Sequence, residues 1–430
     1  MGGPSSAATR ESHVNRTDSS TRTRTTRLGV AALALASAGP LLAATPAGAT
    51  TVAHYSYTGS AYGTTASVGS VVKSGPSAPI TFGCTTNPGL HPRNTTAGLN
   101  LAPLGTTGTV ASTGDTSAAP VQAKTSASTA SVNLLSGLVH ATAIKAASST
   151  TATATGYALS SAGTSVTSLV VAGVPVKADA APNTRITLTG FGYLIVNEQI
   201  AKTNGLTVNG LHLFVTTTNR LGVAVGSNLT ISHADSALTG PVAGVLGGYA
   251  YGTKADLGTL ALSGPSFTAY MPCQGTGGVL RSNTGAGVNL GTTLTAGTIT
   301  DTDKGAISAT SANGETTSTV QAANVLNGLV KATLVKADAH AASNGSTYTF
   351  TDTGSGYGSL TVTGHPEIGP SVAANTTVAL PGIGTLYLRR VLRSSHSITI
   401  RMIELVLTNP VNGLSAGTDI KVAVANATAS

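Results

Sequence analysis

The chain has 430 residues and a formal net charge of +8 at pH 7, with 9% charged residues, 52 glycines and no tryptophan. A surface that binds nucleic acid needs a dense basic face, and so sparse a charge content excludes one. Small and β-branched side chains are abundant, which favours strands joined by tight turns. We therefore expect an all-β protein.

The first 49 residues are typical of a secretory signal peptide. Three arginines precede an apolar run over 28–44, and the run is followed by an Ala-Gly-Ala sequence at 47–49, the order of a charged region, a hydrophobic segment and a cleavage site. The alternative is an uncleaved amino-terminal anchor, which the Gly-Pro pair at 39–40 disfavours. Cleavage leaves 381 residues with a net charge of +5. Because no later apolar run reaches about 18 residues, we expect no transmembrane segment in the mature chain.

The mature chain reads as two copies of one unit. The sequence Ala-Tyr-Gly-Thr at 61–64 recurs at 250–253, and further on Gly137 and Gly328 mark a shared motif. No shorter period is visible within a unit, which argues against a solenoid. We expect a signal peptide over 1–49 and two tandem homologous domains, β-sandwich or jelly-roll-like, over 50–239 and 240–430.

Short β-forming segments separated by turn residues predict the strands of the first unit. These segments are 66–72, 126–134, 138–147, 166–172, 185–189, 193–200, 206–216 and 228–232.

Two hairpins stand out in each unit. The motif around Gly137 predicts one, since glycine supplies the positive φ of a tight turn. In the second copy a helix over 320–341 is the alternative, although Gly328 in mid-segment would destabilise a helix by about 1 kcal/mol. The other hairpin is predicted over 193–215 with Asn204 and Gly205 at its tip, and its counterpart covers 385–407.

The two cysteines, Cys84 and Cys273, hold equivalent positions in the two units. A disulfide between them requires Cα atoms within about 7 Å, so the strands that carry them would have to face each other. Two free thiols or an intermolecular bond are the alternative.

Arginine is concentrated in the second unit, at Arg389, Arg390, Arg393 and Arg401. The equivalent residues of the first unit are uncharged or acidic, so the shared fold does not require the arginines. We expect an anion-binding patch for a phosphate-rich wall polymer or acidic glycan, because arginine matches phosphate oxygens bidentately. The alternative is an edge strand that charge protects from aggregation.

The sequence predicts no catalytic site, no cofactor and no metal site. It lacks nucleophile-elbow, zinc-protease and phosphate-loop motifs. His212 and His233 lack the close paired spacing of metal ligands, and the second unit has Glu404 and Val424 in their places. Without tryptophan to stack on sugars, a carbohydrate hydrolase or binding module is also less favoured.

Two segments carry a family resemblance. Residues 132–143, which contain the Gly137 motif, and residues 207–212 ahead of 221–233 resemble the "choice-of-anchor P" family of secreted actinobacterial proteins. The resemblance covers both units, the first more faithfully, and implies a surface-associated or extracellular protein of a family without an established activity. The chain departs from the family in having no recognisable terminal anchor. Asn209 and His212 become Arg401 and Glu404 in the second unit.

Together these features predict a secreted or cell-surface protein without catalysis, acting as a structural or adhesive element in the cell envelope. Its expected partners are envelope polymers or other surface proteins. The alternative is a secreted binding module for an anionic wall polymer or glycan, and the third is an unrecognised extracellular hydrolase. A hydrolase would need a concave site with convergent polar groups.

Overall fold

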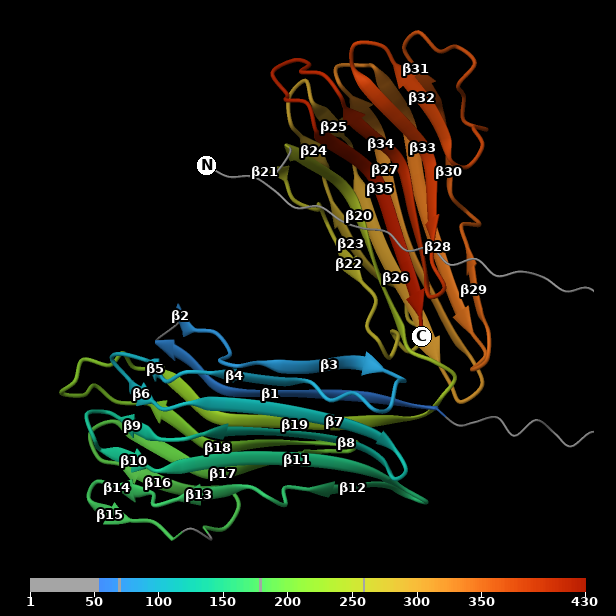
Figure 1. The fold of residues 1–430 in the computed structure, drawn as a ribbon. Coiled ribbons are helices and arrows are strands. Elements are labelled where there is room, and N and C mark those ends of the chain that lie inside the picture. The colour runs from blue at the N-terminus through green and yellow to red at the C-terminus, as the bar shows by residue number, and fades with distance from the viewer. Residues whose placement is uncertain (1–53, 69–70, 178–179, 258–259) are drawn as a thin grey trace, which may run out of the picture. The chain divides into compact units, whose positions relative to one another are not determined.

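The computed structural model describes residues 54–430, except 69–70, 178–179 and 258–259. The predicted signal peptide lies outside these residues. The described elements are all strands in antiparallel sheets (Figure 1). Over the same ranges we find no helix with the length and apolarity needed to span a bilayer. The all-β prediction is confirmed, and the helix expected as an alternative over 320–341 is wrong.

The described strands fall into two sets that share no sheet, which we call the first half (54–242) and the second half (246–430). The predicted domain boundary, 239/240, lies inside the last strand of the first half. The last strand of the first half ends at Val242, and the first strand of the second half begins at Leu246.

The first half contains three sheets. The seven-stranded sheet has the order β16 (Thr184–Leu188), β17 (Gly192–Lys202), β18 (Gly205–Val215), β19 (Asn228–Val242), β1 (His54–Val68), β2 (Val71–Ser74), with β3 (Ile80–Thr85) also on β1. A six-stranded sheet has the order β12 (Gly156–Ser160), β11 (Ala143–Thr153), β8 (Val121–Thr129), β7 (Val110–Ala118), β4 (Arg93–Thr96), with β13 (Ser165–Thr167) on β11. The other has the order β15 (Val174–Pro175), β14 (Val170–Val171), β10 (Val139–Ala141), β9 (Val132–Leu134), β6 (Gly105–Thr107), β5 (Leu99–Asn100).

The second half contains two sheets. Its seven-stranded sheet has the order β21 (Leu260–Ser263), β20 (Leu246–Leu257), β35 (Thr418–Ala429), β34 (Ser397–Leu407), β33 (Gly384–Arg393), β32 (Thr376–Leu380), with β22 (Ala269–Tyr270) on β20. Its nine-stranded sheet contains β23 (Arg281–Gly285), β26 (Ile299–Ile307), β27 (Ala312–Val325), β25 (Leu294–Ala296) and β24 (Val288–Asn289), with β28 (Val330–Ser343) on β27 and β29 (Tyr348–Thr351), β30 (Gly356–Tyr357) and β31 (Leu360–Val362) on β28.

Sheets pack face to face in each half, and the same hydroxyl bond links them in both. Thr125 on β8 donates to the carbonyl of Asp235 on β19 at 3.0 Å. Its counterpart Thr316 on β27 donates to the carbonyl of Asn426 on β35 at 2.9 Å. Elsewhere the cores consist mainly of buried Leu, Ile, Val and Ala. A core of such small side chains lets a hydroxyl reach the opposite sheet and satisfy its carbonyl there.

Both predicted hairpins form in both halves. The Gly137 turn joins β9 to β10, with Val139 opposite Leu134, and Leu135, Ser136 and Gly137 all have positive φ. The same turn joins β27 to β28 in the second half. The helix alternative fails there because 312–325 and 330–343 pair residue by residue along their length. The second hairpin is β17–β18, with its counterpart in β33–β34.

One row of residues crosses each seven-stranded sheet without regular pairing, and we call it the shift row. In the first half it is Gly63, Ser232, Gly210 and Asn197, each skipped between paired neighbours. Ser232 and Asn197 have left-handed φ values of 54° and 51°. The pairing register is the same on both sides of the row, because each strand skips one residue. The alternation of the two faces along a strand nevertheless changes phase there, so side chains three apart along a strand point the same way across this row. The second half has the same row, at Gly252, Ala423, Met402 and Arg389.

Candidate functional site

Two of the predicted arginines surround one buried carboxylate on the outer face of the second half's seven-stranded sheet. Arg390 on β33 donates to Glu404 Oε2 at 2.7 Å, and Arg401 on β34 donates to Glu404 Oε1 at 2.5 Å. Lys421 on β35 lies 4.0 Å from the same carboxylate. The Glu404 side chain is only 2% exposed. Arg401 and Glu404 share this face, although they are three residues apart, because the shift row lies between them.

The other two arginines belong to a different contact. Arg389, a residue of the shift row, forms an ion pair with Asp352 at 2.9 Å. Arg393 donates to the carbonyl of Phe350 at 2.5 Å and lies 3.5 Å from Asp352. The four arginines therefore form two clusters, and each of them faces a carboxylate. An anion would have to compete with Glu404 and Asp352 for these guanidinium groups.

The first half builds its cluster on equivalent positions with the carboxylate on the other strand of the hairpin. Glu198 takes the place of Arg390, and His212 takes the place of Glu404. Glu198 Oε2 lies 2.6 Å from His212 Nδ1 and accepts a bond from Asn209 at 2.6 Å. Burial alone would raise the pKa of Glu198, but the bonds from His212 and Asn209 hold that pKa below its usual value. Both halves therefore place a polar pair in contact at these equivalent positions, and the strand that carries the acidic member differs between them.

A second cross-strand pair is exchanged in the same way. Asp115 on β7 lies opposite Lys124 on β8 in the first half. Lys304 on β26 lies opposite Glu315 on β27 in the second. The acidic and the basic partner have changed places while the strand pairing is the same. Pairing of opposite charges, rather than one sign of charge, is what the two halves have in common here.

The two histidines considered as metal ligands have other partners. His212 Nε2 lies 3.0 Å from Asn228 Oδ1, in addition to its contact with Glu198. His233 Nδ1 lies 2.7 Å from Asn209 Oδ1, and its ring stacks on Tyr62 with centroids 4.3 Å apart. Burial lowers the pKa of His233 to about 4, so this ring is neutral at neutral pH.

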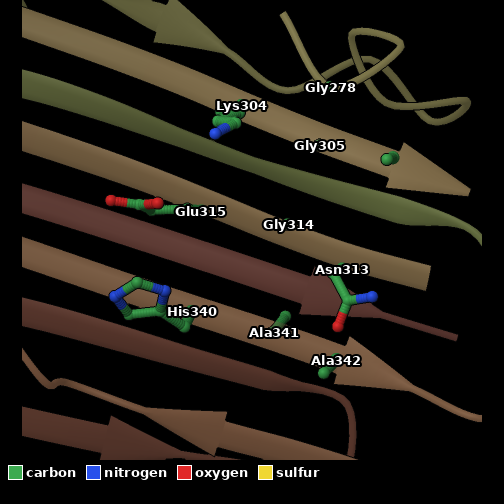
Figure 2. Close-up of a pocket in the computed structure, with 10 residues that line it drawn as sticks. Gly278, Lys304, Gly305, Asn313, Gly314, Glu315, His340, Ala341 and Ala342 are labelled. Carbon is green, nitrogen blue, oxygen red and sulfur yellow. The ribbon is translucent and has the colours of Figure 1, made fainter. Parts of the chain in front are cut away.

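A cavity of about 250 Å³ opens on the nine-stranded sheet of the second half. Figure 2 shows Lys304, Glu315 and His340, which follow one another across β26, β27 and β28. Glycines and alanines at its other end leave the space open, and Asn313 lines it there. The cavity is shallow and charged, a surface hollow rather than an enclosed site.

Glu315, Asp338 and His340 bring possible metal-ligand atoms within 4.8 Å of one another. However, Lys336 lies 2.7 Å from Asp338, and His340 Nε2 lies 3.0 Å from the same carboxylate. The bond to Asp338 raises the pKa of His340, which favours its cationic form. A divalent metal would have to displace Lys336 and the proton of His340, so the group is better described as an ion-pair cluster.

The cysteines form a bond between the halves. Cys84 at the end of β3 and Cys273 are joined by a disulfide, with Cα atoms 5.7 Å apart and a sequence separation of 189. The equivalent positions of the two cysteines in the sequence allowed this bond but did not require it. Oxidation of this kind is typical of exported proteins.

Sequence reasoning missed a pair of structural asparagines. Asn183 and Asn375 occupy equivalent positions with φ of 61° and 60°. The side-chain oxygen of Asn183 accepts a bond from the Gln199 backbone N–H, and that of Asn375 accepts one from Val391. Asparagine tolerates this conformation better than most residues. The recurrence of asparagine at these two equivalent positions was the sequence signal for the left-handed conformation.

Comparison of the chain with protein-family models, with curated proteins and with solved structures gives no match.

Proposed function

We propose that the mature chain is a secreted, non-catalytic structural or adhesive protein of the cell envelope or its surroundings, with the choice-of-anchor P family as its proposed affiliation. The observation that carries this proposal is that the acidic residue of a cross-strand pair and its partner have changed places between the halves. Glu198 and His212 correspond to Arg390 and Glu404, and both pairs are in contact. Residues that bind or transform a substrate need a fixed chemical identity, whereas a cross-strand pair that stabilises a sheet needs only opposite partners.

Two further features support export. The amino-terminal sequence is typical of a signal peptide, and the Cys84–Cys273 bond suits an oxidising compartment. Each half is a unit of long antiparallel strands with polar pairs on an outer face. Such a unit suits a layer or a spacer at the cell surface.

A direct test is co-sedimentation of residues 50–430 with purified cell envelope of the host at low and high salt. The proposal expects the protein in the pellet. Binding that weakens with salt would point to ionic contacts. Absence of the protein from the pellet at both salt concentrations would contradict an envelope role.

The alternative, a binding module for an anionic polymer, is tested in the same assay. Replacement of Arg389, Arg390, Arg393 and Arg401 by Gln would abolish salt-sensitive binding if the arginines hold the polymer. Because each arginine already faces a carboxylate, we expect the envelope binding of this variant to persist. A screen of ester, glycoside and peptide substrates addresses the third alternative, a hydrolase.

A further inference from the structure

Three tyrosines gather beside β22 in the second half. Tyr249 and Tyr251 lie on β20 with nearly parallel rings whose centroids are 5.9 Å apart. Tyr270 on β22 lies directly opposite Tyr249, and its side chain is 64% exposed. Figure 1 shows β22 beside β20, with β23 of the other sheet nearby. A single exposed ring is ordinary at a protein surface, but this one lies beside two further tyrosines and two hollows.

Two hollows meet at Tyr270. One, of about 320 Å³, is lined by the three tyrosines together with Lys254, Pro265 and Thr268. The other, of about 330 Å³, lies between β22 and β23 and shares Thr268 and Tyr270 with the first. We call the two hollows together the tyrosine groove. Two open hollows that share Tyr270 suit a chain-like ligand that passes across this ring.

The charges of the tyrosine groove are neutralised within it. Lys254 lies 2.8 Å from Asp256. Arg281 binds Asp303 through two nitrogens, at 2.9 and 2.6 Å, and also donates to the carbonyl of Tyr270. A net neutral groove has little attraction for an anionic polymer. Its phenol, guanidinium and hydroxyl groups can still exchange hydrogen bonds with an uncharged ligand rich in hydroxyls.

Comparison with the first half distinguishes contacts of the shared fold, which we call the frame, from residues found in the groove alone. Asn283 donates to the carbonyl of Thr268, and its equivalent Asn94 donates to that of Pro79 in the same way. This contact belongs to the frame. Tyr251 and Pro265 of the groove recur as Tyr62 and Pro76. Four other groove residues do not recur: the first half has Ser60, Thr81, Pro92 and Gly114 where the second has Tyr249, Tyr270, Arg281 and Asp303. The fold forms without them, so their presence is specific to the second half.

We propose that the tyrosine groove binds a neutral polysaccharide, and this inference rests on the proposed envelope role and names a ligand class for it. Tyrosine offers a rigid apolar ring for the C–H face of a sugar and a hydroxyl for its polar edge. The exposed Tyr270 ring is the central stacking platform. Arg281, oriented by Asp303, supplies donors at one end of the groove. Binding of this kind depends weakly on salt.

The test is affinity electrophoresis of residues 50–430 through native gels that contain mannan, arabinogalactan or hydroxyethyl cellulose. We expect retardation by at least one of these neutral polymers, unchanged by moderate salt. Tyr270→Ala should weaken it about tenfold, whereas Tyr270→Phe, which keeps the ring, should retain most of it. Tyr270→Leu should behave like the Ala variant if planar stacking matters. Because Tyr270 is largely exposed, these variants should fold normally, which thermal unfolding checks.

Tyr348→Ala is the matched control, since Tyr348 is an exposed tyrosine on β29, outside the tyrosine groove, and its removal should leave mobility unchanged. Equal retardation of parent and Tyr270→Ala, or none in any gel, would overturn the proposal. Self-association that Tyr270→Ala abolishes, without retardation, would assign the groove to protein contacts instead. If the protein sediments with envelope but no polymer retards it, this inference fails while the proposed function survives.

Discussion

A single carboxyl inside the second half makes its stability depend on pH. Asp301 on β26 is fully buried, and in the first half its position is held by Ser112. Burial raises the pKa of Asp301 to about 7, from 3.8 for an ordinary aspartate. The folded state therefore binds a proton more tightly than the unfolded chain. Stability attributable to this group is greatest below about pH 4, falls as pH rises to about 7, and then levels off.

Replacement of Asp301 by Asn removes this titration. We expect Asp301→Asn to be increasingly more stable than the parent as pH rises from 4 to 7, by a limiting difference on the order of 4 kcal/mol from the pKa displacement. Thermal unfolding followed by circular dichroism at matched pH values measures the difference in stability between variant and parent. A difference that stays constant from pH 4 to 7 would show that the pKa of Asp301 is not raised in the folded state.

Two comparisons sharpen this experiment. Glu367→Gln is the control, because its carboxylate is largely exposed and should give a small effect at every pH. His233 acts in the opposite sense, since its folded pKa of about 4 lies below that of an unfolded histidine, and the first half loses stability as pH falls from 6.5 to 4. Variant and parent must therefore be compared at each pH.

At the scale of strands, local chemistry allowed much of the fold to be predicted. Turns were found because glycine and asparagine mark positions of positive φ, as at Gly137 and Gly328. Predicted strands were too long where the chain passes between sheets. Segment 126–134 is β8 and β9, separated by two residues, and the two strands belong to different sheets. Nothing in a local pattern distinguishes a continuous strand from one that changes sheet.

The shift row explains why the outward-facing residues could not be predicted. A strict alternation places Arg401 and Glu404 on opposite faces, yet they are in contact. Ser232 and Ala423 take the left-handed conformation there. Because serine and alanine are not typical of that conformation, the sequence does not predict it. The arginines themselves were detectable as an uneven composition. Their carboxylate partners were not, because strand register sets those contacts.

The turn at Gly137 provides an element-scale prediction. Its φ of 87° is unfavourable for any residue with a Cβ, although the space around it is open. We expect Gly137→Ala to destabilise the first half by about 1 kcal/mol. Gly83→Ala in β3 is the control, since Gly83 has no positive φ and equally open surroundings. Chemical denaturation of the two variants measures the difference, and equal stabilities would contradict a strained turn.

For the whole molecule, we expect the exchanged charges to disfavour strand pairing between the two similar halves while they fold. Tandem homologous domains are prone to exchange strands. If β7 paired with β27, Asp115 would face Glu315. If β8 paired with β26, Lys124 would face Lys304. Like charges directly opposite destabilise a strand pair, so each wrong pairing is penalised and each correct one is not.

This selectivity can be removed while the native pair keeps opposite charges, in a variant with Lys304→Asp and Glu315→Lys. The same variant places a second cation opposite His340, so its unfolding temperature is measured beside that of the parent. A mispaired β26 would now offer a carboxylate to Lys124. We expect a lower yield of monomer after dilution from denaturant, measured by size-exclusion chromatography, and an unchanged yield would contradict the idea. The order of acidic and basic residues in each pair would then favour pairing of a strand with a strand of its own half.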